Sequence, residues 1–256
     1  MKGAITGDYI GSIYEFNNTK DAYFQLISPN KEITDDSICT IAVANAILRG
    51  IPYGEALHEL CLKFPDPMGA YGNGFLAWLN RKDMSPYNSC GNGSAMRVSA
   101  VGWAFEKEDV MLSEAEKSAA CTHNHPEGVK GAKCVAHAVW YLRHYKDDLE
   151  GFKKLMSQYY PEWETYYKPF EQWNGVCQNT VPLCIQEVVY GKSYEDTIRN
   201  IVLCGGDTDT NGAVAGAMAG ARWGVPDNLW QAAYKTADPY LQGIIDEFVT
   251  KFNVNG

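Results

Sequence analysis

"NIVLCGGDTDTNGAVAGAMAGARWG", residues 200–224, places two aspartates and two threonines directly before a run of small residues. Glycine recurs at every fourth position of this run, at Gly212, Gly216 and Gly220, and an alanine follows each of them. Residues spaced by four lie on one face of an α-helix, and a face made of glycine and alanine lets a second helix approach closely. The pattern therefore predicts a buried helix whose first turn carries acidic side chains.

The acidic residues at this helix start are Asp207 and Asp209, with Thr210 beside them. Aspartate and threonine commonly cap helices by accepting hydrogen bonds from free N–H groups, and one aspartate is explained in that way. Two aspartates with flanking threonines exceed what a cap requires. The segment also matches the first half of a calcium loop, but the bidentate glutamate needed at position twelve is replaced by Met218.

A second segment of the same form is "TDDS", residues 34–37, which precedes another helical pattern. Taken alone, Thr34, Asp35, Asp36 and Ser37 are more typical of a helix cap than of a ligand set. Adjacent carboxylates nevertheless repel each other unless a cation or a proton intervenes. Two such clusters in one chain favour a metal site, and hard oxygen ligands select Mg²⁺, Mn²⁺ or Ca²⁺. Four carboxylates are enough for two ions that share a bridging group.

Three other segments are candidates for the site. In "GDYIGSIYE" (7–15), helical spacing puts Glu15 on the same face as Asp8, although spacing alone favours a surface glutamate. The glycine-rich "NSCGNGSAMRVSAVG" (88–102) could present N–H groups to a phosphate, but an ordinary turn is the favoured interpretation. In "CTHNHPEGVKGA" (121–132), His123 precedes a helix that Pro126 starts, and a hydrogen-bonding or ligand-contacting role suits it better than zinc binding.

The chain as a whole predicts an all-α single domain over residues 1–256. Helical periodicity dominates, helix starts are expected at Ser113 and Ser193, and a long structured loop is expected over residues 157–175. The formal net charge of −9 argues against nucleic acid and anionic membranes as partners. No apolar run of about 18 residues predicts a membrane span. The eight cysteines form no C-x-x-C pair, so we expect a cytoplasmic protein with free thiols. We also expect a monomer.

Five of these segments, in order, resemble the ADP-ribosylglycohydrolase family: "GDYIGSIYE" (7–15), "TDDS" (34–37), "GNGSAMR" (91–97), "THNHPEG" (122–128) and "GGDTDT" (205–210). Each motif is weak alone, but their combination and order are specific. The resemblance implies a compact all-α fold built around two Mg²⁺ or Mn²⁺ ions.

The resemblance also implies roles for individual residues. The implied metal ligands are Thr34, Asp35, Asp36, Asp207, Asp209 and Thr210. Glu15, Asp36 and Asp207 are the candidates for proton transfer. The implied contacts to the substrate diphosphate are Ser89, Cys90, Gly91, Asn92, Gly93 and His123. Some relatives carry an aromatic residue at the position of Cys90 that stacks on the adenosine. Here that platform is either missing or supplied from elsewhere, by Tyr87 or Tyr71.

The implied reaction is hydrolysis of the bond between the distal ribose of ADP-ribose and an acceptor, through an oxocarbenium-like transition state. The partner is then an ADP-ribosylated protein or a small ADP-ribose conjugate. The "HNHP" sequence resembles arginine-acting members of the family more than serine-acting ones, which implies arginine as the acceptor, with serine and O-acetyl-ADP-ribose as alternatives. Two other functional classes remain open: a non-catalytic relative similar to certain lens crystallins, and a metal-dependent phosphohydrolase.

Overall fold

The computed structural model describes residues 1–170 and 172–254. Within these residues the fold is all-α and no β-sheet is present, which confirms the predicted class. The α-helices are α1 (Lys2–Gly11), α2 (Asp35–Arg49), α3 (Tyr53–Lys63), α4 (Asn73–Leu79), α5 (Gly93–Met96), α6 (Ser99–Ala104), α7 (Glu108–Ala120), α8 (Pro126–His144), α9 (Leu149–Tyr159), α10 (Cys177–Tyr190), α11 (Tyr194–Leu203), α12 (Thr208–Trp223), α13 (Asp227–Tyr234) and α14 (Pro239–Lys251). Two 3₁₀ turns, η1 (Ser12–Tyr14) and η2 (Trp163–Thr165), complete the helical elements of this part of the chain.

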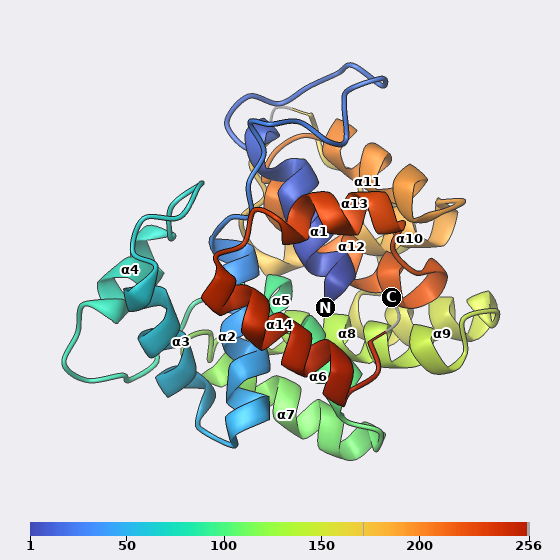
Figure 1. Ribbon diagram of the computed structural model, residues 1–256. Coiled ribbons are helices and arrows are strands. Elements are labelled where there is room, and N and C mark those ends of the chain that lie inside the picture. Colours follow the sequence, from blue (N-terminus) through green and yellow to red (C-terminus); the bar gives the residue numbers. More distant parts are fainter. Residues whose placement is uncertain (171, 255–256) are drawn as a thin grey trace.

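The close helix pair at the centre of the molecule is α1 with α12 (Figure 1). A Cβ atom on Gly7 would overlap the carbonyl oxygen of Gly212, and one on Gly3 would overlap the carbonyl oxygen of Gly216. The two backbones therefore touch, which only glycine permits at these positions. The predicted close approach of the glycine face is confirmed, and its partner is the N-terminal helix.

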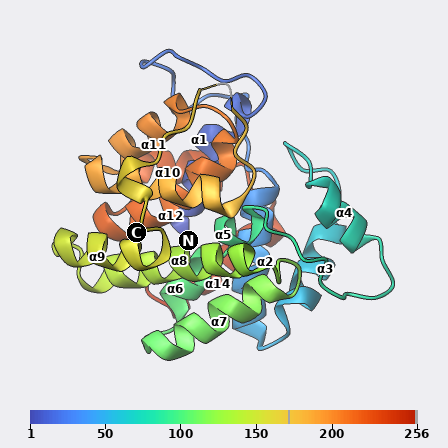
Figure 2. The ribbon, with the colours of Figure 1, turned by 180° about the vertical axis from the view of Figure 1, so that it is seen from behind.

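A second central element is α8, which crosses behind this pair and contacts α12, α7 and α6 (Figure 2). It begins at Pro126, as predicted, and the His125 side chain accepts a hydrogen bond from the backbone N–H of Glu127 at 3.1 Å. Proline suits a first helical turn because its missing N–H would have no partner there. The fixed start of α8 sets the position of the histidine segment that precedes it.

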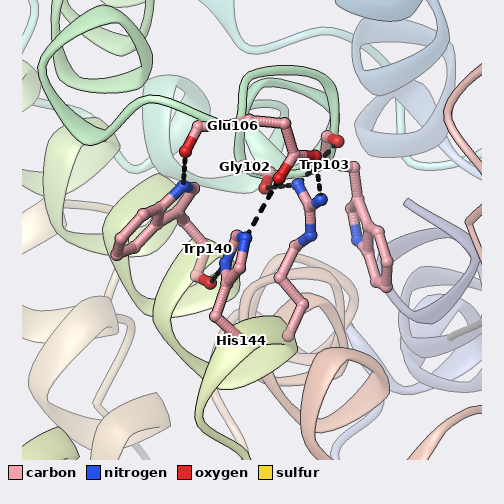
Figure 3. Close-up of polar contacts among 6 residues, drawn as sticks. Gly102, Trp103, Glu106, Trp140 and His144 are labelled. Carbon is pink, nitrogen blue, oxygen red and sulfur yellow. Dashed lines mark hydrogen bonds and ion pairs between the residues drawn. The ribbon is translucent and has the colours of Figure 1, made fainter.

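The far end of α8 is joined to the end of α6 by polar contacts (Figure 3). Arg143 donates to the backbone carbonyl of Gly102 at 3.1 Å, which satisfies one of the terminal acceptors of α6. Trp140 donates from its indole N–H to the carbonyl of Glu106 at 3.0 Å, and the imidazole of His144 lies 3.1 Å from the Glu106 carboxylate. These contacts hold α6 against α8 and so fix the segment that follows the glycine-rich turn.

Two boundary predictions differ from the structure. Ser113 does not start a helix, because α7 already begins at Glu108 and Ser113 lies inside it. The segment expected to be a loop from 157 begins within α9, which continues to Tyr159. Ser193 does cap α11 as predicted, since its hydroxyl accepts from the N–H of Asp196 at 3.1 Å. No helix in the described ranges is long and apolar enough to cross a membrane.

Candidate metal centre and substrate cleft

The two acidic helix starts, which are more than 170 residues apart in sequence, meet in the structure. Thr210 in the first turn of α12 donates its hydroxyl to the Asp36 carboxylate in the first turn of α2, at 3.2 Å. Carboxylate oxygens of Asp35, Asp36 and Asp209 all lie within 4.8 Å of one another. The expected convergence of the two clusters is therefore present.

A second group of three carboxylates lies beside the first. Oxygens of Glu15, Asp207 and Asp209 also lie within 4.8 Å of one another, so Asp209 belongs to both groups. Glu15 follows the 3₁₀ turn that continues α1, and the contact between α1 and α12 brings it to the start of α12. One carboxylate shared by two trios is the arrangement that a bridged pair of cations requires.

The hydrogen bonds separate the capping interpretation from the ligand interpretation. Thr34 does cap α2, because its side chain accepts from the N–H of Asp36 at 3.2 Å. Asp207 occupies the N-cap position of α12 but makes no side-chain cap bond. Its carboxylate instead accepts a hydrogen bond from the side-chain amide of Asn92, at 2.7 Å. Capping therefore explains the threonine at position 34. It does not explain Asp207, whose carboxylate lines the cleft.

The electrostatics of the cluster suit a cation. Asp36 and Asp209 are each 2 % exposed, and within the described chain no lysine, arginine or histidine forms an ion pair with them. Burial raises the pKa of both carboxyl groups well above the usual range, and the neighbouring carboxylates raise it further. Asp36 Oδ1 and Glu15 Oε2 are buried and have no hydrogen-bond partner among the described residues. Such unpaired hard oxygens fit Mg²⁺ or Mn²⁺.

Asp8, on α1, fixes the start of α2. The sequence analysis did not identify it as a site residue. It is fully buried on α1 and accepts hydrogen bonds from the Thr34 N–H at 2.9 Å, the Thr34 hydroxyl at 2.7 Å and the Ser37 N–H at 3.2 Å. The Ser37 hydroxyl also donates to it. Because Asp8 takes the Thr34 proton and the Asp36 N–H occupies one lone pair of the Thr34 oxygen, one lone pair of that hydroxyl remains available to a cation. The signal in the sequence was an aspartate between glycines on a helix face that must be buried.

The glycine-rich turn lies against the same acidic centre. A cavity of about 540 Å³ is lined by the acidic residues together with Ser89, Gly91, Asn92, Gly93 and His123. Asn92 connects the turn to the centre through its bond to Asp207, and its own N–H donates to the carbonyl of Gly175 at 3.2 Å. Cys90 does not appear among the lining residues, and its carbonyl accepts from the N–H of Cys177 at 3.1 Å.

The cavity is lined by both tyrosines named from the sequence, Tyr71 and Tyr87, and by further aromatic residues. Tyr71 lines the cavity although it is only 5 % exposed, and its hydroxyl donates to the carbonyl of Phe64 at 2.8 Å. Tyr87 is half-buried, with its ring tilted by 60° against His123. Phe16 and Trp173 were missed by the sequence analysis: their rings stack with 7° between the planes, and both line the cleft while remaining exposed.

The chain is similar to known proteins over most of its length. The family described as ADP-ribosylglycohydrolase matches residues 1–256. The human (Homo sapiens) "ADP-ribosylhydrolase ARH3" is 25 % identical over 330 residues, covering 95 % of this chain and 91 % of its own. The "ADP-ribosyl-[dinitrogen reductase] glycohydrolase" of Rhodospirillum rubrum is 24 % identical over 255 residues, covering 88 % and 84 %. A solved "ADP-ribosylglycohydrolase-related protein complex" shares the fold, with a TM-score of 0.74, 19 % identity and coverage of 99 % and 95 %.

Proposed function

The chain belongs to the ADP-ribosylglycohydrolase family and is a hydrolase of glycosidic bonds, and from this premise we propose that it releases ADP-ribose from arginine side chains at a two-cation centre. One observation carries the proposal: Asp209 belongs to two carboxylate trios that line the same cavity as the glycine-rich turn. Burial leaves these carboxylates without a compensating positive charge, which supports a requirement for Mg²⁺ or Mn²⁺.

The residues proposed to hold the cations are Thr34, Asp35, Asp36, Asp207, Asp209 and Thr210. Bound there, the ions would offset part of the negative charge of the carboxylates and fix the hydroxyl groups of the distal ribose. The remaining chemistry belongs to the side chains. Negative carboxylates stabilise the positive charge that develops on the ribose in an oxocarbenium-like transition state. Asp36 and Asp207 are assigned to proton transfer, and Glu15, at the more exposed edge of the cluster, is the candidate acid for the leaving group.

The diphosphate is assigned to the glycine-rich turn, where Ser89, Gly91, Asn92 and Gly93 line the cavity. Because the N–H of Asn92 donates to Gly175 and that of Gly91 to the Ser89 hydroxyl, phosphate binding is assigned to the remaining N–H groups of the turn, a mode that needs no basic side chain and is consistent with a formal net charge of −9. Cys90 does not line the cavity, and its carbonyl accepts from the N–H of Cys177 at 3.1 Å, which ties the turn to the start of α10. His123 lies over the turn and is assigned to the same diphosphate.

Arginine is the proposed acceptor for two reasons. The "HNHP" segment at residues 123–126 favoured it, and the acidic cleft favours a cationic leaving group over a neutral one. The natural partner is then an ADP-ribosylated protein or a small ADP-ribose conjugate. The named substrate of the Rhodospirillum rubrum relative, an ADP-ribosylated dinitrogen reductase, belongs to the same class of partner.

The test is release of ADP-ribose from arginine-linked and serine-linked peptides and from O-acetyl-ADP-ribose, with Mg²⁺, Mn²⁺ or EDTA, followed by chromatography. We expect metal-dependent release of intact ADP-ribose, fastest from the arginine peptide. Release from the serine peptide or the acetyl ester alone would replace the proposed acceptor. Release of AMP or phosphate would indicate a phosphohydrolase, and ADP-ribose binding without release from any conjugate would indicate a binding protein.

A further inference from the structure

A chain of buried polar groups leads from Arg97 to the edge of the cleft at His123. Arg97 follows α5 and is 1 % exposed, Thr122 is fully buried, and His123 is 4 % exposed. The Arg97 guanidinium donates to the Thr122 hydroxyl at 2.7 Å and to the carbonyl of Ser118 at 3.0 Å. The Thr122 hydroxyl lies 2.7 Å from Nδ1 of His123.

The donors and acceptors in this chain determine where the imidazole proton lies. A guanidinium has donors and no acceptor, so the Thr122 oxygen accepts from Arg97. The single hydroxyl proton of Thr122 is then free to go to Nδ1 of His123, which must be unprotonated to accept it. If Nδ1 carried the proton instead, the Thr122 oxygen would receive two donors. Its own buried proton would then be left with the sulfur of Cys121, a weak acceptor, in place of the imidazole nitrogen, which disfavours that tautomer.

The other nitrogen of the ring, Nε2, faces the glycine-rich turn. A Cβ atom built on Gly93 would lie 3.1 Å from Nε2, and one on Gly91 would lie 3.5 Å from it. Nε2 makes no hydrogen bond to any side chain or backbone group of the described residues, and His123 lines the cavity. The absence of side chains at Gly91 and Gly93 therefore leaves room for a ligand atom next to Nε2.

Arg97 also affects the charge of the ring. Burial lowers the pKa of His123 well below its usual range, and the nearby positive charge of Arg97 lowers it further. The imidazole is therefore neutral at physiological pH, with one N–H group and one acceptor nitrogen. Since Nδ1 is occupied by the Thr122 proton, the N–H group is the one that faces the cleft.

We propose that Arg97 and Thr122 are positioning residues that hold His123 as the Nε2–H tautomer, so that the ring offers one neutral donor to an oxygen bound over Gly91 and Gly93. The assignment of this oxygen to the diphosphate of ADP-ribose rests on the proposed function. The tautomer of His123 does not depend on that function. Sequence analysis had placed His123 at the substrate but contained no signal for the tautomer, because Arg97 lies 25 residues from Thr122 in sequence.

The direct test is ¹⁵N NMR of the histidine-labelled whole chain, without ligand, on the wild type, Thr122→Ser and Thr122→Val. In the wild type we expect the His123 shifts of an unprotonated Nδ1 and a protonated Nε2. Thr122→Ser keeps the hydroxyl and should preserve them, whereas Thr122→Val removes it at similar volume and should populate the Nδ1–H form. A protonated Nδ1 in the wild type, or shifts that Thr122→Val leaves unchanged, would overturn the proposal.

A second measurement, the Kd for ADP-ribose by calorimetry with the same three proteins, separates this inference from the proposed function. We expect Thr122→Val to bind ADP-ribose about 10-fold more weakly, as for one lost hydrogen bond to a charged acceptor, and Thr122→Ser to bind nearly as the wild type does. If NMR shows the predicted tautomer but calorimetry shows no ADP-ribose binding, the positioning role of Arg97 and Thr122 is supported and the proposed function is rejected. If the protein releases ADP-ribose but Nδ1 of His123 is protonated, the proposed function is supported and the positioning role of Arg97 and Thr122 is rejected.

Discussion

Thr210 Oγ1 donates a hydrogen bond to Asp36 Oδ2 at 3.2 Å, across 174 positions of the sequence. This contact joins the first turn of α12 to the first turn of α2, and it places Asp209, the residue before Thr210, between both carboxylate trios. The two helix starts therefore form one centre. Their side chains are held by rigid helices, which is the support that a precise metal site needs.

Replacing the shared carboxylate should abolish activity and leave the fold intact. Asp209→Asn keeps the size of the side chain but removes a charge from both trios, so we expect a loss of roughly 1,000-fold or more in kcat/KM. The matched control is Asp109→Asn, at an exposed position in the first turn of α7, which should retain wild-type activity. An Asp209→Asn protein with near wild-type turnover and an unchanged circular dichroism spectrum would reject the assignment.

Asp8→Asn should weaken metal binding without removing any proposed ligand. The amide has one acceptor oxygen in place of the carboxylate that now receives four hydrogen bonds from Thr34 and Ser37, and its NH₂ group would face those donors. We expect a loss of about 1–3 kcal/mol in the free energy of unfolding. We also expect a Mn²⁺ Kd that is raised by about 10- to 100-fold. Calorimetric titration with Mn²⁺ measures the second effect, and an unchanged Kd would show that Asp8 has no role in holding the centre.

The glycine contact between α1 and α12 should be intolerant of a single methyl group. Gly7→Ala would place Cβ against the Gly212 carbonyl, and forcing the backbones apart should cost about 1–3 kcal/mol or more. Gly243→Ala is the matched control, because no atom lies within 4 Å of its Cβ position on α14. There, helix propensity predicts a gain of about 0.5–1 kcal/mol. Chemical denaturation of both variants measures the difference, and equal effects would contradict the packing argument.

The stability of the metal-free protein should fall as the pH rises. Burial, with the charge of Asp207, raises the pKa of Glu15 from an ordinary 4.5 to about 8, and burial shifts the pKa values of Asp35, Asp36 and Asp209 in the same direction. The folded protein therefore holds protons that the unfolded chain has released. The stabilisation from Glu15 is complete below about pH 4.5 and is lost as the pH rises through about 8.

Calorimetry with EDTA or with saturating Mn²⁺ tests this dependence between about pH 5 and about pH 8. Since the cation replaces the lost protons, the gap between the two Tm values should widen with rising pH. The buried His123 and Lys31 titrate in both samples, so their effects largely cancel in that gap. A gap that stays constant or narrows would mean that the carboxylates do not form the cation site.

Local patterns in the sequence were enough to predict the all-α class, the close-packing face of residues 212–220 and the acidic helix starts. Each of these features depends on residues within one or two helical turns. The partner of the glycine face could not be predicted in this way, because Gly3 and Gly7 lie about 200 positions away from it and a glycine stripe does not specify what packs against it.

The parts of the site that escaped prediction depend on contacts between distant segments. The sequence pattern places Asp8 on a helix face but does not reveal its role, which depends on the four hydrogen bonds that it accepts from Thr34 and Ser37. Spacing also does not reveal the hydrogen bond from the Tyr71 hydroxyl to the carbonyl of Phe64, which holds that tyrosine at the cavity. Phe16 and Trp173 stack although 157 positions separate them in sequence. The error at Ser113 is local: this residue resembles a helix cap, but the residues before it already belong to α7.

The most direct test of the two-cation centre is anomalous X-ray scattering from crystals of the wild-type protein soaked in Mn²⁺. We expect two peaks on either side of the Asp209 carboxylate, one against Glu15 and Asp207 and the other against Asp35 and Asp36. Crystals of Asp209→Asn should lose both peaks. Absence of Mn²⁺ from this cluster at saturating concentration, in an enzyme that still releases ADP-ribose in EDTA, would contradict the account.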